Sequence, residues 1–186
     1  ALGHTSRTFY SELGKPRNYI TFPCWNPVMI ATVCSHALEA GIEPDYVKSL
    51  IRRRGLTPPS AATAAAGWPW QFKVLTFGQF QLLKNDAPVT FVGKAQRRPL
   101  ELLKALIAYG SDRVKEEQLT EALWPRIDGD SAHRSFTTTL HRLRKLLGED
   151  RAVVLQEGRL SLDTRYFWVD TWAFEQITAD IDRHLK

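Results

Sequence analysis

Five side chains between residues 134 and 145 could bind a polyanion, because they are basic or donate hydrogen bonds and recur at helical spacing. If residues 131–147 form a helix, these five side chains share its outer face: Arg134, Thr138, His141, Arg142 and Lys145. No acidic residue occurs anywhere in this stretch. Arginine can read guanine edges in the major groove of DNA, and threonine can contact the thymine methyl group. The alternative is an ordinary core helix with a solvated basic face, so the flanking elements must decide between the two.

The other face of the same helix is apolar, with residues at i, i+4, i+7 and i+11: Phe136, Leu140, Leu143 and Leu147. Asp130 is the expected N-cap, and Gly148 ends the helix. Two shorter helices are predicted before it. One covers 99–109 and has Pro99 at its first position, and the other covers 116–124.

Strand patterns lie on both sides of these helices. Runs at 153–156 and 159–162 flank Glu157-Gly158, which predicts a tight hairpin. Upstream, a three-stranded antiparallel meander is predicted from three β-prone runs, at 72–77, 80–83 and 87–92.

A strand meander, three helices and a C-terminal hairpin resemble the OmpR/PhoB-type winged-helix effector domain. Residues 140–147 (LHRLRKLL) look like the end of that family's recognition helix, and 118–125 (QLTEALWP) look like its second helix and the following loop. The version in SARP-like bacterial transcriptional activators is closer still, since there the wing leads into a stretch like Trp168-Val169-Asp170 and then a helix. The resemblance covers about 71–175. It implies an α+β winged helix-turn-helix with an N-terminal antiparallel sheet and a C-terminal wing, in a cytoplasmic activator.

The resemblance also implies roles for individual residues. Arg142 would read a base and Arg134 would clamp the backbone. Apart from the resemblance, a helix lying in the major groove would have Thr139 and Arg144 on its flanks, where phosphates run. The wing at 152–163 would lie on the flanking backbone or in the minor groove, and its basic residue, just past the turn, is Arg159.

Arg97 and Arg98 come just before Pro99, at the start of the first predicted helix. Free amide donors, the helix dipole and two guanidinium groups could together form a phosphate site. The alternative, of about equal weight, is that Arg97 and Arg98 lie in a solvated loop and bind nothing.

The sequence divides the rest of the chain into further parts. Residues 1–56 are expected to be a helical segment that carries an αα-hairpin of the kind found in tetratricopeptide-like arrays. A Pro/Ala/Ser-rich linker follows at 57–70, before the DNA-binding domain at 71–169. At 170–186 a helix is predicted with Asp170 as N-cap and an apolar stripe, Phe174, Ile177, Ile181 and Leu185. It is expected either to open a truncated helical domain or to pack back on the winged helix.

Composition limits the function classes. The 186-residue chain has a net charge of +5 and a pI of about 9.4, which is consistent with a polyanionic partner. No apolar run is long enough for a membrane span. Cys24 and Cys34 are ten residues apart without a zinc motif, so we expect reduced thiols and no metal. No phosphate loop or nucleophile–base pair suggests an enzyme or a cofactor.

Two functions follow from these patterns. The first is sequence-specific binding of double-stranded DNA by a bacterial transcription regulator, monomeric when free and paired on direct-repeat promoter sites, with RNA polymerase as a further partner. The second is a protein-interaction module of a larger regulator, in which the basic helix docks an acidic partner.

Overall fold

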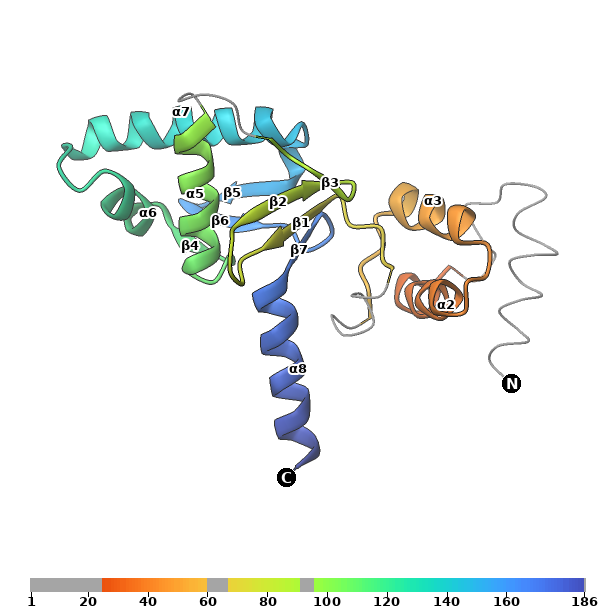
Figure 1. The fold of residues 1–186 in the computed structure, drawn as a ribbon. Helices are drawn as coiled ribbons and strands as arrows, with labels where there is room; N and C mark the ends of the chain where they lie inside the picture. The colour runs from red at the N-terminus through yellow and green to blue at the C-terminus, as the bar shows by residue number, and fades with distance from the viewer. Residues whose placement is uncertain (1–24, 60–66, 91–95, 186) are drawn as a thin grey trace. The chain divides into compact units, whose positions relative to one another are not determined.

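The computed structural model describes residues 25–59, 67–90 and 96–185, and it is a mixed α+β structure with two small sheets (Figure 1). Residues 1–24, half of the linker predicted at 57–70 and the end of the third predicted strand lie outside the described residues. Contacts divide the chain into two compact units. One unit joins residues 1–81 to 168–186, and the other comprises residues 82–167, whereas the sequence predicted a domain over 71–169. None of the helices in the described ranges could span a lipid bilayer.

The second unit contains the predicted order of three helices and a hairpin. Its elements are α5 (Arg97–Ala108), β4 (Val114–Lys115), α6 (Glu116–Leu123), α7 (Gly129–Leu147), the 3-10 turn η4 (Asp150–Ala152), β5 (Val153–Gln156) and β6 (Arg159–Leu162). Two details of the prediction are wrong. Helix α7 begins two residues earlier than expected, so Asp128 and not Asp130 is its N-cap. Helix α5 begins at Arg97, which makes Pro99 its third residue and not its first.

The three helices of this unit enclose one apolar core. Each contributes side chains that are almost completely buried: Leu102, Leu103 and Leu106 from α5, Leu119 from α6, and Phe136, Leu140, Leu143 and Leu147 from α7. Full burial of one such side chain stabilises a fold by roughly 1.5–3 kcal/mol. The apolar stripe of α7 therefore fixes which face of the helix is left for solvent.

A three-stranded sheet completes this unit, with the order β4-β6-β5. Strands β5 and β6 pair antiparallel and end at the partners Gln156 and Arg159. The two residues between them have φ of 51° at Glu157 and 68° at Gly158. Positive φ at both central residues is the type I′ geometry that suits the twist of a hairpin, so the predicted tight turn is confirmed.

The first unit begins with the predicted helical hairpin, formed by α2 (Pro27–Glu39) and α3 (Pro44–Arg54). The Asn26 side chain caps α2 by accepting hydrogen bonds from the amides of Val28 and Met29. The core of this hairpin includes buried residues of both helices and two tryptophans: Ile30, Cys34, Val47, Leu50, Trp68 and Trp70. Burial raises the pKa of the Tyr46 hydroxyl in the same cluster.

A four-stranded sheet has the order β3-β2-β1-β7. The three predicted strands form β1 (Phe72–Leu75), β2 (Gln81–Lys84) and β3 (Ala87–Pro88), and β2 pairs antiparallel with β3. Strand β7 (Phe167–Val169) was not predicted. It lies next to β1, so residues expected only to lead into the last helix are part of a sheet.

Helix α8 (Asp170–His184) follows β7 directly, and Val169 occupies the N-cap position predicted for Asp170. The Asp170 carboxylate mainly serves the end of β1: it accepts hydrogen bonds from the Thr76 amide (2.7 Å), the Thr76 hydroxyl (2.6 Å) and the Phe77 amide (3.0 Å). The Phe77 ring also meets Phe174 edge-on, at 5.8 Å between ring centres. These contacts attach the first turns of α8 to the strand.

Candidate nucleic-acid interface

The ends of α7 are set by local sequence. At the N-terminus, Asp128 Oδ1 accepts a hydrogen bond from the Ser131 amide at 3.0 Å. That hydrogen bond, with a smaller contribution from the charge of Arg134, lowers the pKa of the Asp128 carboxyl. At the C-terminus, Gly148 has φ of 70°, a conformation that favours glycine.

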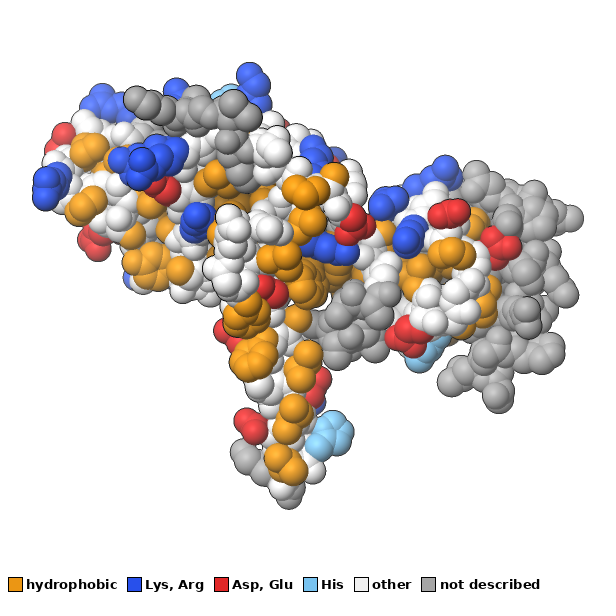
Figure 2. All heavy atoms as spheres, in the orientation of Figure 1, with side chains coloured by type: hydrophobic (Ala, Val, Ile, Leu, Met, Phe, Trp, Pro, Cys, Tyr) orange, Lys and Arg blue, Asp and Glu red, His pale blue; other side chains and the backbone are white. Residues whose placement is uncertain are grey.

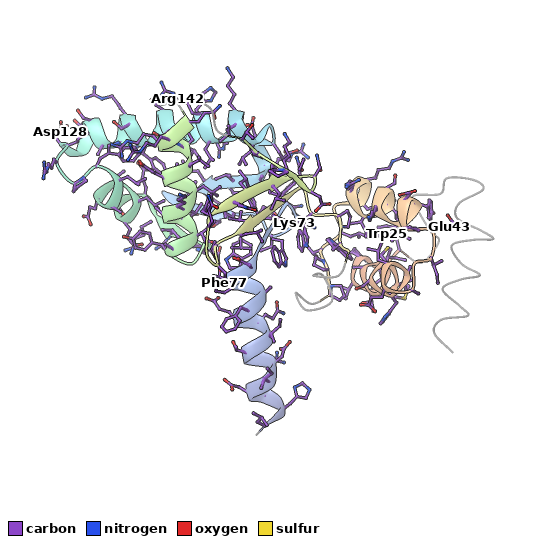
Figure 3. The ribbon with its side chains drawn as sticks, viewed as in Figure 1. Trp25, Glu43, Lys73, Phe77, Asp128 and Arg142 are labelled. Atoms are coloured by element: carbon purple, nitrogen blue, oxygen red, sulfur yellow. The ribbon has the colours of Figure 1, made fainter. Side chains whose placement is uncertain are left out.

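The outer face of α7 is a basic stripe, made of Arg134, Thr138, His141, Arg142 and Lys145, and all five side chains are exposed. Basic side chains gather along α7 in Figure 2, and Arg142 lies on its outer side in Figure 3. Within the ranges that the structure describes, no carboxylate forms an ion pair with Arg134, Arg142 or Lys145. Their charge is therefore free to meet an anion.

Two other residues of α7 assigned to DNA do not belong to this stripe. Thr139 is only 5 % exposed, because it follows Phe136 by three residues and precedes Leu143 by four, which places it on the buried face. The Arg144 guanidinium donates two hydrogen bonds to the Val153 carbonyl, at 3.1 and 2.8 Å. It ties the end of α7 to β5 and does not point to the surface where phosphates were expected.

Arg97 and Arg98 lie in the first turn of α5, as the phosphate-site hypothesis requires, but each already has a partner. Arg97 Nε and Arg98 Nη1 both donate to the Glu101 carboxylate at 2.9 Å. Arg98 also donates to the Leu123 carbonyl at 3.3 Å. Exposed ion pairs of this kind contribute little to stability, so an anion would compete with Glu101 without first breaking a strong contact.

The β5–β6 hairpin carries its cation, Arg159, directly after the turn, where it is paired with Gln156 at the turn end of the ladder. Arg159 is partly buried, and its Nη1 donates to the Arg113 carbonyl at 3.1 Å. The adjoining turn exposes the acidic Glu157, after Val154 and Leu155, which are 38 % and 39 % exposed. The turn end of the hairpin therefore carries both a cation and a carboxylate.

One contact near the basic stripe was missed by sequence reasoning. His133 Nδ1 and Glu116 Oε1 lie 2.5 Å apart and link the start of α6 to the first half of α7. The preceding residue, Lys115, is exposed on β4. A strand of two residues has no periodicity to detect, so only its pairing with β6 identifies it.

Other chemistry has little support in the described ranges. No group of three or more His, Cys, Asp or Glu side chains there could hold a metal ion. Cys34 is a buried free thiol, and Cys24 lies outside these ranges. Comparison of the chain with known protein families, curated proteins and solved structures found no match.

Proposed function

We propose that residues 82–167 form a winged-helix domain that binds double-stranded DNA with α7 in the major groove. The observation that carries the proposal is the basic stripe of α7: it is exposed, and its cations form no ion pair with any described carboxylate, while the opposite face of the same helix is buried in the core. A groove about 12 Å wide admits an α-helix whose outer face donates hydrogen bonds.

The roles of the side chains follow from their positions on α7. Thr138, His141 and Arg142 lie in the middle and second half of the helix and would meet base edges. Arg134 and Lys145, towards the two ends, would contact the backbone. Thr139 and Arg144 would support the helix from behind, and Arg144 would also hold the wing against it.

The β5–β6 hairpin is the wing of this proposal. Its turn carries Glu157, which a phosphate would repel, so the wing would contact the flanking backbone through Arg159, the residue just past the turn. Arg97 and Arg98 at the start of α5 would contact the DNA backbone at a second place. A phosphate would there replace the Glu101 carboxylate as the acceptor of their hydrogen bonds.

A role in bacterial transcription regulation rests on the resemblance to SARP-like activators, as do the cytoplasmic location and RNA polymerase as a partner. A single winged helix buries roughly 600–1,000 Å² of protein surface on DNA, which seldom gives nanomolar specific binding. Two copies on a direct repeat, with half-sites about 10–11 bp apart, would supply the missing affinity.

Selection from a random DNA pool with the purified chain tests the proposal. Enrichment of one short motif, singly or as a direct repeat, is the expected result. If no motif is enriched, and an acidic protein surface is bound as tightly as DNA at equal salt, the basic stripe is a protein-docking surface and the proposal is wrong.

A further inference from the structure

Two basic side chains face each other across the sheet of the second unit. Strand β4 pairs antiparallel with β6, and the register places Lys115 directly opposite Arg159. The next pair in the ladder, Val114 opposite Leu160, is buried, at 3 % and 0 % exposure. Since side chains alternate between the two faces of a sheet, Lys115 and Arg159 share the outer face.

This arrangement is electrostatically unfavourable in the free protein. Side chains directly opposite each other in an antiparallel pair have Cβ atoms about 4.5–5.5 Å apart, and like charges there are destabilising. In the described part of the chain, neither Lys115 nor Arg159 forms an ion pair with a carboxylate. The acidic neighbour Glu116 is directed to His133 instead.

The Arg159 guanidinium is oriented without being neutralised. Its Nη1 donates to the Arg113 carbonyl at 3.1 Å, and a neutral carbonyl leaves the positive charge in place. The hydroxyl of Ser161, two residues further along β6, accepts a hydrogen bond from the Arg113 amide at 2.8 Å, which fixes this loop against the strand. Arg159 is therefore held just past the hairpin turn with its charge still available.

Lys115 precedes a residue that contacts the first half of α7. Glu116 follows Lys115 in the chain, and its carboxylate lies 2.5 Å from the ring of His133, the residue before Arg134 of the basic stripe. A phosphate bound next to α7 would therefore be attracted by Lys115 and Arg159 as well as by the basic stripe.

We propose that Lys115 and Arg159 together clamp a backbone phosphate of DNA beside α7, an inference that rests on the DNA-binding function proposed above. The arginine guanidinium presents a planar set of hydrogen-bond donors, and the lysine ammonium is a compact positive charge. The oxygens of one phosphate can accept hydrogen bonds from both groups. The phosphate removes the repulsion that the pair carries in the free protein. Lys115 is thereby a DNA contact that neither helix periodicity nor the resemblance indicates.

The test compares two measurements, the melting temperature and the DNA affinity, which the clamp predicts will change in opposite directions. Lys115→Met relieves the repulsion, so the melting temperature of the free chain stays equal or rises. Loss of one phosphate contact lowers affinity for cognate and random DNA alike, by roughly fivefold at 0.15 M salt, and flattens the slope of log Kd against log salt by about 0.9. Lys115→Glu, which places a carboxylate opposite Arg159, raises the melting temperature further and lowers DNA affinity more.

Lys104→Met is the matched control, because it removes the same charge from an exposed position on α5. It should leave the salt slope unchanged. A purely structural Lys115 would lower both stability and affinity, so a fall in melting temperature in Lys115→Glu overturns the clamp. So does an unchanged salt slope in Lys115→Met. If the wild-type chain binds no DNA, the proposed function fails as well; if it binds DNA with the slope unchanged by Lys115→Met, only the clamp fails.

Discussion

Helices α7 and α8 have the same kind of sequence pattern, an apolar stripe along one side, but the stripe is buried in α7 and exposed in α8. The stripe of α7 is buried, as Phe136 and Leu143 at 0 % exposure illustrate. The stripe of α8 is open, with Phe174 at 56 % and Ile181 at 52 % exposure, and Figure 2 shows it as a line of apolar side chains along the helix.

The comparison teaches that an apolar stripe predicts a helix but not what covers it. In α7 the core takes the apolar side, so the exposed surface is cationic. In α8 a polar residue, Asp170, attaches the start of the helix to the end of β1, and the apolar stripe beyond it stays largely exposed. The exposed face, and not the amphipathic pattern, therefore distinguishes a candidate DNA-binding helix from one with an open apolar stripe.

The largest expected difference between the two helices is in stability. Leu143→Ala empties a fully buried site in α7 and should lower the free energy of unfolding by about 2–5 kcal/mol. Leu185→Ala, at a position 81 % exposed just after α8, should change it by less than about 0.5 kcal/mol. Urea unfolding of the two variants measures both. Equal losses would mean that the α8 stripe is covered in solution.

The second prediction concerns the polar attachment of α8. Burial opposes ionisation of Asp170, but hydrogen bonds from Phe77, Thr76 and Thr171 outweigh it and lower the pKa of its carboxyl. Asp170→Ala should cost roughly 1.5–3 kcal/mol, because it leaves the Thr76 and Phe77 donors without their acceptor.

The same attachment should depend on pH. Because the folded-state pKa of Asp170 lies below the unfolded value of about 3.9, its contribution is complete above that pH and disappears as pH falls through the folded-state pKa. Asp170→Asn should therefore unfold with a weaker pH dependence than the wild type in this acidic window. An identical acid profile in both proteins would contradict the attachment.

The third prediction separates two neighbours on α7. Arg144→Met removes the hydrogen bonds to the Val153 carbonyl and should cost about 1–2 kcal/mol of stability, with little change in the salt slope of DNA binding. Lys145→Met should leave stability nearly unchanged but flatten the salt slope of DNA binding, since Lys145 is exposed and forms no ion pair within the described ranges. Thermal melts and salt titrations distinguish them, and matching profiles would refute the assignment of separate roles.

The fourth prediction concerns the start of α5, where only a small effect on stability is expected. Changing Arg97 and Arg98 together to Ala should alter stability by less than about 1 kcal/mol, because their pairing with Glu101 is exposed. If these residues also contact phosphate, all DNA sequences should bind more weakly and the salt slope should flatten. An unchanged slope would remove Arg97 and Arg98 from the interface.

The sequence predicted those features whose signal is local. The 3.6-residue period and Gly148 gave the extent of α7 to within two residues, and Glu157-Gly158 identified the tight turn. The same period should also have placed Thr139 on the buried side, because it lies three residues from Phe136. Thr139 is buried, and does not lie on the exposed flank that was predicted for it.

The remaining features depend on partners that are distant in sequence. Asp170 bonds to residues 93 and 94 positions earlier, and Lys115 meets Arg159 only through strand pairing. Arg144 reaches Val153 because the chain turns back after α7. No local pattern encodes these contacts, so charged residues that hold the fold together could not be told from those left for a ligand.

Binding of the Arg142→Ala variant to the selected DNA motif and to a scrambled duplex tests the central claim most directly. If α7 reads bases in the major groove, this variant should lose about 1–3 kcal/mol on the selected motif, lose little on scrambled DNA, and relax specificity at one position. Equal losses on the two duplexes would assign Arg142 to the backbone. No loss on either would contradict the placement of α7 in the groove.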